Sequence, residues 1–436
     1  MDWKSGIDCQ KTLCVPGTKV LGGVSLYLTK LPNYQHEWDQ HELPTVILKD
    51  LFVIDFGGSF KLCFLSCFNE APVLTFQRPR LIAGPAFRTF LLECCPVLRR
   101  RFWPTFWCLG GRSQTLLRFL LKSKPLLTYR TELLRTADGG QLSLDWLEGP
   151  SQQLNPQLTV LLLPGLTSNS RENYILHLAA QAQLCVVFNY RGCGKEDLLT
   201  PRLYCAANTE DMSLVVHHIR SVQPRSPILA VGLSMGGMLL LNFLAEQGQQ
   251  TGVDAAMTIS VPWDAFTSTA SLEEPLNKML FNCMLTRLLT GTVRRYFDIM
   301  VLWKVVNVCC IPLQARTVWE YDERLISVMF GFRSNGDYYH AASPFHKVPA
   351  IHVPVLCLNA ADDPLSPECA FPVEAIQISP CVALAVTEHG GHLAFLEGAF
   401  PCGESFMDRL FHEFASMILS HGPLHFTATQ NHVTNR

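Results

Sequence analysis

The sequence predicts an α/β fold in which a mostly parallel central sheet is covered by helices on both faces. From about residue 159, short apolar runs alternate with segments of helical spacing, which is typical of strands buried on both faces. A tight glycine turn at 232–236 stands between one such run and a helical segment. Composition agrees, because 48% of the residues are hydrophobic and 17% are charged, which suits a large core and excludes a disordered chain.

The expected elements can be given in chain order. Residues 133–135 and 141–146 flank Ala137-Asp138-Gly139-Gly140, and an Asp-Gly pair there predicts a strand, a tight turn and a second strand. A helix ending near Val222 is expected to begin at Asn208 as its N-cap. The remaining strands are expected at 159–163, 184–188, 228–231, 253–260, 355–358 and 382–386, and the remaining core helices at 172–183 and 238–247.

About 90 residues separate Ser260 from the strand at Val355, far more than the minimum of about 10–12 residues that a crossover needs. Two apolar stretches of helical spacing, 272–289 and 293–308, lie in this interval. We therefore expect a helical cap inserted over the sheet. The predicted organisation is an atypical N-terminal segment 1–76, a basic, aromatic, membrane-proximal segment 77–126, two halves of the core at 127–261 and 350–420, the cap 262–349 and a tail 421–436.

Charge is unevenly distributed along the chain. The formal net charge is −2, which argues against a nucleic-acid partner. The segment from Arg78 to Lys124, however, contains ten basic residues and only one acidic residue, Glu93. Trp103 and Trp107 lie in the same segment. Arginine beside tryptophan favours contact with an anionic membrane surface, although a solvated basic face packed beside an acidic domain gives the same pattern.

Targeting signals are scarce in this sequence. No window supplies the roughly 20 mostly apolar residues of a membrane-spanning helix, and the first 30 residues do not form a secretory signal. The 17 cysteines are scattered and include no C-x-x-C pair, which favours a reducing, intracellular compartment. We expect a membrane-associated intracellular protein, and nothing in the sequence indicates an obligate protein partner.

The turn at 232–236 predicts a nucleophile. It has the pattern G-x-S-x-G after a buried run and before a helix, where Ser234 would sit on a sharp turn whose neighbours have no room for a Cβ atom. The following helix would direct its N-terminal N–H groups and dipole toward the serine hydroxyl. A glycine-rich strand-to-helix turn without chemistry is the alternative.

A serine nucleophile needs a base and an orienting carboxylate, which follow in the order serine, acid, histidine in this type of fold. Asp362 and Asp363 follow one expected strand, and His389 and His392 follow the next. Asp363 is preferred as the acid, because Asp362 can cap the turn with its own side chain. His392 is preferred as the base, because small residues precede it.

An oxyanion hole is expected from two backbone N–H groups. Met235, directly after the nucleophile, would supply one donor. Leu166, in the loop Pro164-Gly165-Leu166-Thr167 after the strand at 159–163, would supply the other. A plain strand-to-helix turn is the alternative for that loop.

Together these motifs resemble a family, the α/β-hydrolase-domain group of membrane-associated phospholipases and esterases, with plant early-embryogenesis and yeast acyl-esterase relatives. The resemblance implies an α/β-hydrolase fold, a Ser234–Asp363–His392 triad and hydrolysis of acyl esters of phospholipids or acylglycerols. Members usually carry one membrane anchor, whereas residues 1–76 show no clean anchor helix. The shared motifs lie at 77–81, 136–140, 145–146, 163–167, 188–192, 208–211, 234–237, 275–277, 321–332, 360–363 and 390–398.

Rival functions fit less well, and no cofactor or metal is expected. His36 and His41 resemble a zinc helix, but they lie five positions apart rather than four, so they would not share a face. A lipid acyltransferase remains the alternative, since an alcohol can replace water at the same serine, although no histidine begins an H-x-x-x-x-D signature. A non-enzymatic binding module would be expected to lack a member of the triad.

Overall fold

The computed structural model describes residues 25–29, 51–55, 61–65, 78–108, 110–148, 158–302 and 312–422. The chain divides into two compact units, Met1–Thr75 and Phe76–Arg436. In the first unit, strands β1 (Ser25–Thr29), β2 (Leu51–Asp55) and β3 (Lys61–Leu65) pair antiparallel in the order β1-β2-β3. The predicted features of this unit that involve its other residues, such as the pair His36 and His41, lie outside the described residues.

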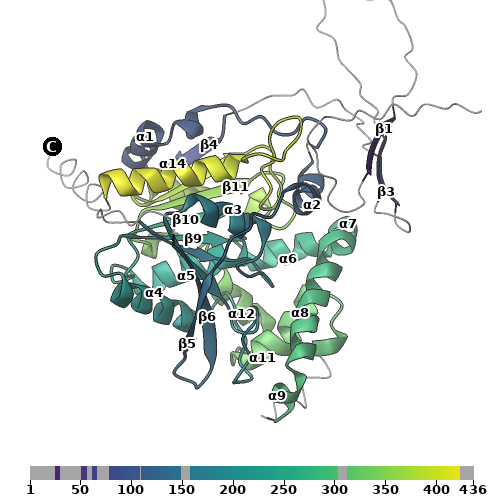
Figure 1. Ribbon diagram of the computed structural model, residues 1–436, viewed down its shortest axis with the longest axis vertical. Helices are drawn as coiled ribbons and strands as arrows, with labels where there is room; N and C mark the ends of the chain where they lie inside the picture. Colours follow the sequence, from purple (N-terminus) through teal and green to yellow (C-terminus); the bar gives the residue numbers. More distant parts are fainter. Residues whose placement is uncertain are drawn as a thin grey trace, which may run out of the picture. The chain divides into compact units, whose positions relative to one another are not determined.

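Nine described strands of the second unit form one mixed sheet in the order β4-β12-β11-β10-β9-β7-β8-β6-β5 (Figure 1). The six neighbours from β12 to β8 are parallel, while β4, β6 and β5 add antiparallel edges. The strands are β4 (Arg80–Ala83), β5 (Arg130–Arg135), β6 (Gln141–Glu148), β7 (Thr159–Leu163), β8 (Leu184–Asn189), β9 (Ile228–Leu233), β10 (Ala255–Ile259), β11 (Val355–Ala360) and β12 (Val382–Thr387).

Every residue of the six parallel strands is buried, because helices cover both faces of the sheet (Figure 1). One core cluster joins the sheet to α1, α3 and α14, and the other joins it to α4, α5 and α13. These helices are α1 (Pro85–Cys94), α3 (Asn173–Gln181), α4 (Glu210–Val222), α5 (Met235–Gln247), α13 (Val373–Ile378) and α14 (Phe406–His421).

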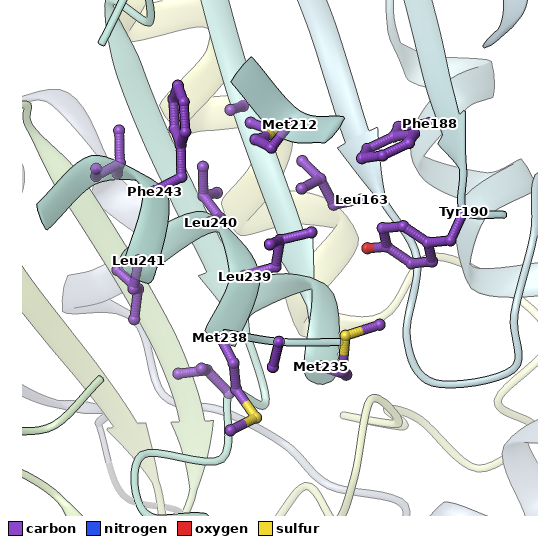
Figure 2. Packing of buried hydrophobic residues seen from close by; sticks show 14 of the residues in the cluster. Leu163, Phe188, Tyr190, Met212, Met235, Met238, Leu239, Leu240, Leu241 and Phe243 are labelled. Atoms are coloured by element: carbon purple, nitrogen blue, oxygen red, sulfur yellow. The ribbon is translucent and has the colours of Figure 1, made fainter. Parts of the chain in front are cut away.

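Helix α5 runs directly behind the glycine turn and is buried from Met235 to Leu244. Figure 2 shows Leu239 and Met235 of this helix lying toward Leu163 and Tyr190. Leu163 is the last residue of β7, and Tyr190 directly follows β8. A helix that is apolar on all sides belongs in a protein interior. This packing seats the start of α5 against the end of the sheet.

Helices occupy the interval between β10 and β11. They are α6 (Ala265–Glu273), α7 (Pro275–Asn277), the π-helix η2 (Lys278–Asn282), α8 (Cys283–Arg295), α9 (Phe297–Leu302), η4 (Pro312–Gln314), α10 (Val318–Tyr321), the π-helix η5 (Asp322–Ile326), α11 (Ser327–Met329), α12 (Asn335–Ala342) and η6 (Val348–Ala350).

Several predicted boundaries were wrong for identifiable reasons. Helix α4 is capped at Thr209, not at Asn208, and no side-chain cap bond is made there. The helix expected at 272–289 breaks at Glu274, because proline at 275 lacks an N–H and disfavours a helical residue before it; helical backbone then continues from Pro275 to Arg295. The helix expected at 293–308 is interrupted at Tyr296, between the end of α8 and the start of α9. Residues 303–308 lie outside the described part of the chain.

Segments before the first core hairpin also belong to the second unit. Helix η1 (Pro96–Arg99) and helix α2 (Gly111–Leu121) lie between α1 and β5. Pro104 forms an isolated antiparallel bridge with Glu397, and Trp107 Nε1 donates to the carbonyl of Ala399 at 2.7 Å. None of the described helices is long and apolar enough to cross a bilayer.

Candidate active site

The turn between β9 and α5 holds Ser234 in a strained conformation, with φ 53° and ψ −121°. The glycines beside it are required sterically. A Cβ atom on Gly232 would lie 2.5 Å from the carbonyl oxygen of Gly236, and one on Gly236 would lie 2.2 Å from that of Leu163. Backbone atoms cannot yield as a flexible side chain can, so this turn tolerates only glycine at both positions.

Three of the predicted residues meet at the carboxyl edge of the sheet. His392 Nε2 lies 2.8 Å from Ser234 Oγ, and His392 Nδ1 lies 2.9 Å from Asp363 Oδ2. All three side chains are buried; Ser234 is 8% exposed, His392 7% and Asp363 3%. The imidazole therefore bridges a hydroxyl and a carboxylate, the arrangement that lets a base accept a proton while a carboxylate orients it.

The second aspartate and the second histidine lie apart from this chain of hydrogen bonds. Asp362 accepts the N–H of Gly391 at 2.8 Å and pairs with His389 at 3.4 Å. Burial raises the pKa of the Asp362 carboxyl, while the hydrogen bond from His389 opposes that shift. Asp363, rather than Asp362, closes the turn, because its Oδ1 accepts the N–H groups of Leu365 and Ser366. The expectation that Asp362 caps its own turn was wrong.

The loop after β7 lies against the serine. A Cβ atom on Gly165 would lie 3.4 Å from that of Ser234. The N–H groups of Leu166 and Met235 have no acceptor among the described residues. Tyrosines hold the loop in place. Tyr174 Oη accepts the N–H of Gly165 at 3.2 Å, Tyr204 Oη accepts that of Thr167 at 3.0 Å, and Tyr190 Oη donates to the carbonyl of Pro164 at 2.9 Å.

The electrostatics of this edge favour a negative charge beside Ser234. Met235 is the first residue of α5, and the first N–H groups of a helix, together with its dipole, attract anions. Within the described ranges, no group of three or more His, Cys, Asp or Glu side chains is arranged to hold a metal ion.

Sequence reasoning missed the residues that hold the acid and the base. Asn359 Nδ2 donates to Ser366 Oγ and to the carbonyl of Val261, both at 3.0 Å, which supports the turn carrying Asp363. Ser260 Oγ accepts the N–H of Leu393 at 2.9 Å, and Thr115 Oγ1 accepts that of His392 at 2.8 Å. A polar residue directly after a buried strand, as at Ser260, is a usable signal; Thr115 carries none.

Comparison with known proteins agrees with this geometry. A family model described as alpha/beta hydrolase fold matches residues 159–399. The chain is 44% identical to phospholipase ABHD3 of Homo sapiens over 85% of this chain and 90% of that protein. It is 32% identical to embryogenesis-associated protein EMB8 of Picea glauca over 71% of each chain, and 28% identical to a monoacylglycerol lipase of Saccharomyces cerevisiae over 57% of this chain and 56% of that one.

The family model covers more than half of the chain, and the human relative extends the match well beyond it on the N-terminal side. The predicted fold, a mostly parallel sheet with helices on both faces, is confirmed. This chain belongs to the alpha/beta hydrolase family, in the branch that includes phospholipase ABHD3 and EMB8.

Proposed function

We propose that this protein is a serine hydrolase that cleaves acyl esters of lipids through Ser234, His392 and Asp363. The observation that carries the proposal is the continuous hydrogen-bond path from Ser234 Oγ through both ring nitrogens of His392 to Asp363. Ser234 Oγ attacks the ester carbonyl carbon while Nε2 takes its proton, and Nε2 then protonates the departing alcohol as the ester C–O bond breaks. In the second half of the reaction, Nε2 takes a proton from water, which attacks the acyl carbonyl carbon. The bond to Ser234 Oγ then breaks, Oγ regains a proton from Nε2, and the fatty acid is released.

The N–H groups of Met235 and Leu166 form the oxyanion hole in this proposal. Met235 directly follows Ser234, and Gly165, the residue before Leu166, lies against Ser234. Met235 also starts a helix whose dipole stabilises negative charge. The tyrosines that hold the 164–167 loop keep the Leu166 donor in place before substrate arrives. Such preorganised donors contribute about 3–4 kcal/mol each to transition-state stabilisation.

The relatives named phospholipase and monoacylglycerol lipase indicate a carboxylic ester hydrolase. For the substrate we propose either a phospholipid cleaved in the phospholipase A1 manner, or a medium-chain acylglycerol or short-chain ester. Acyl transfer to an alcohol on the same triad is the alternative, because an alcohol and water compete for one acyl-enzyme.

Residues 262–349 act as a helical cap that selects the acyl chain. The cap touches the acid turn, where Ser271 Oγ donates to the carbonyl of Pro364 at 2.7 Å. Its apolar residues divide into two groups: Phe281 and Leu289 are buried in the core, whereas others on α7, η2 and α8 are about half exposed and free to meet an acyl chain. The exposed ones are Leu276, Met279, Met284 and Leu288.

A surface formed by the exposed side chains within residues 99–106, together with Phe400, holds the enzyme at an anionic membrane. Arg99, Arg100 and Arg101 are exposed, Trp103 and Phe106 are each 51% exposed, and Phe400 is 85% exposed. Each arginine near an anionic leaflet contributes about 1 kcal/mol, less as salt screens it.

Not all ten basic residues of the 78–124 segment can serve this surface. Arg118 and Lys122 are buried against the start of α14, where Lys122 Nζ lies 3.7 Å from Asp408 Oδ2. Arg112 pairs with Glu274 at 3.1 Å. We therefore limit the proposed membrane contact to the arginine and aromatic side chains that are exposed to solvent.

The catalytic proposal is tested by labelling with a fluorophosphonate probe, followed by a panel of phospholipids, acylglycerols and alcohols as acyl acceptors. Ser234→Ala should lose the label and roughly 10³-fold or more of the activity. The matched control is Ser327→Ala, which removes a buried hydroxyl on α11 that bonds to Asn335 and should keep the label at the wild-type rate. Labelling of Ser234→Ala at the wild-type rate would overturn the proposal.

The membrane proposal is tested by flotation with anionic and with neutral vesicles. Wild type should float with anionic vesicles and be released by salt, whereas a triple variant, Arg99→Glu, Arg100→Glu and Arg101→Glu, should not float. Arg112→Glu is a control for charge alone, since that side chain is already paired. Equal flotation of wild type and the triple variant would remove this surface from the mechanism.

A further inference from the structure

The loop that carries His392 has an unfavourable backbone. Leu393 has φ 57° and Phe395 has φ 45°, values in the left-handed region that side chains other than glycine rarely adopt. A residue in this conformation is strained and persists only where surrounding structure holds it. The contacts that hold this loop therefore also determine where the imidazole lies.

Three consecutive N–H groups of the loop donate to side-chain oxygens from three separate segments of the chain, namely the turn after β11, helix α2 and the residue after β10. Gly391 donates to Asp362 Oδ1 at 2.8 Å, His392 to Thr115 Oγ1 at 2.8 Å, and Leu393 to Ser260 Oγ at 2.9 Å. We call these three acceptors the oxygen clamp. The central donor is the N–H of His392 itself, and both residues of that hydrogen bond, Thr115 and His392, are buried.

Helix α2, which supplies Thr115, is fitted closely to the same loop. Gln114 Oε1 accepts the N–H of Leu396 at 3.0 Å, and Arg118 Nη1 donates to the carbonyl of Ala394 at 3.3 Å. A Cβ atom on Gly391 would lie 2.4 Å from the carbonyl oxygen of Gly111, so the loop and the helix touch backbone to backbone.

The hydroxyl of Thr115 is itself oriented. It donates to the carbonyl of Gly111 at 2.7 Å, one turn earlier in α2, which turns an oxygen lone pair toward His392. Both hydrogen-bonding capacities of the hydroxyl are thus used in a fully enclosed position. A serine could make the same two contacts, whereas a valine of the same shape could make neither.

We infer that Thr115 is a positioning residue for ester hydrolysis, holding the backbone of His392 so that Nε2 stays within reach of Ser234 Oγ. The inference rests on the proposed function, and it assigns part of the active site to a helix that precedes the region matched by the family model at 159–399. Without the acceptor, a buried N–H is left unpaired and the strained loop can relax. A displacement of about 1 Å at a catalytic group costs roughly 10²-fold in rate.

The test compares Thr115→Val with Thr115→Ser in hydrolysis of a soluble p-nitrophenyl ester, with kcat, KM and the melting temperature measured for each. Thr115→Val should lower kcat roughly tenfold to a hundredfold with KM nearly unchanged, and should slow fluorophosphonate labelling equally. Thr115→Ser should restore both. Ser113→Ala is the matched control, because Ser113 lies on the same helix and its hydroxyl donates to the carbonyl of Gly110 rather than to the loop of His392.

A purely structural role predicts a different result. Activity per folded molecule would then stay at the wild-type level in Thr115→Val while the melting temperature fell, and this outcome would overturn the inference. If the valine variant does not fold, Thr115→Cys fills similar space with a poor acceptor, and its kcat should fall below that of Thr115→Ser. Failure of the proposed function is distinct, because it would appear as undiminished labelling of Ser234→Ala.

Discussion

The serine turn and the histidine loop lie 2.8 Å apart at their closest side-chain atoms, yet they are built in opposite ways. The turn around Ser234 obtains its shape from its own residues, since Gly232 and Gly236 clear the space that a strand-to-helix reversal needs. The loop around His392 obtains its shape from oxygen atoms of Asp362, Thr115 and Ser260, which come from three other segments of the chain.

The difference separates two kinds of requirement in one site. A nucleophile must be exposed at a sharp turn, and a short run of glycines achieves this locally. A base must lie at a set distance from both nucleophile and acid, which no local rule ensures, because the three are 129 and 29 residues apart along the chain. Substitutions in the turn should therefore act directly on the chemistry, and substitutions in the clamp should act through position.

The largest effect is expected at the acid. Asp363→Asn should lower kcat roughly 10³–10⁴-fold, because an amide cannot hold the imidazole in the tautomer that accepts a proton from Ser234. Asp362→Asn should cost less than about tenfold, since an asparagine oxygen still accepts the N–H of Gly391. Steady-state ester hydrolysis measures both. The reverse ranking would exchange the roles of the two aspartates.

The next largest effect tests the local character of the serine turn. Gly236→Ala should lower kcat by roughly 10²-fold, because its Cβ atom would collide with the carbonyls of Leu163 and Pro164 and displace the loop that carries Leu166. Gly237→Ala is the milder control, because a Cβ atom there would lie 3.1 Å from Cβ of Val261 and 3.2 Å from the carbonyl oxygen of Gly232, about 1 Å farther than the closest contact at Gly236. Equal losses in the two variants, measured as kcat per folded molecule, would contradict a specific role for Gly236.

A smaller effect is expected from the outer part of the clamp. Ser260→Ala should lower kcat about tenfold, less than Thr115→Val, because Ser260 holds the N–H of Leu393 rather than that of the histidine. Ser260 has φ 51°, so Ser260→Gly relieves backbone strain while also losing the hydroxyl. If strain alone mattered, the glycine variant would keep wild-type kcat; if the hydrogen bond matters, both variants lose activity.

The smallest effect on turnover, but a clear one on stability, is expected at Asp322 in the inserted helices. Burial raises the pKa of this carboxyl to about 7, although Tyr339 Oη donates to it at 3.0 Å. The unfolded chain releases the proton near pH 4 while the folded chain retains it to about pH 7. The free energy of unfolding should therefore fall between these values, by roughly 2–4 kcal/mol, and level off above them.

Asp322→Asn removes this titration and keeps an acceptor for Tyr339. Its melting temperature, compared with that of the wild type, should rise from pH 5 to pH 8, while kcat stays close to the wild-type value at each pH. The result would sharpen the contrast between the site and the insert, because it separates the pH dependence of stability from that of catalysis. If the melting temperatures of the two proteins changed with pH by the same amount, the prediction would be contradicted.

The sequence by itself determined the features that depend on near neighbours. Apolar runs predicted the buried parallel strands, and the spacing of glycines around Ser234 predicted a turn that the structure contains. The positions of Asp363 and His392 after consecutive strands were also readable, because parallel strands bring their carboxyl ends to one edge. Each of these signals lies within a few residues, where sterics and periodicity act.

Only the tertiary structure decided which distant side chains complete the site. Nothing around Thr115 distinguishes it from any other threonine in a helix, and its role arises only because α2 packs against the loop of His392. The sequence also did not predict that Arg118 and Lys122 are buried, because they lie in a segment with eight other basic residues. Hydrogen bonds and burial depend on which surfaces meet when the chain folds, and residues some 280 positions apart along the chain, such as Thr115 and His392, carry no local pattern that encodes their contact.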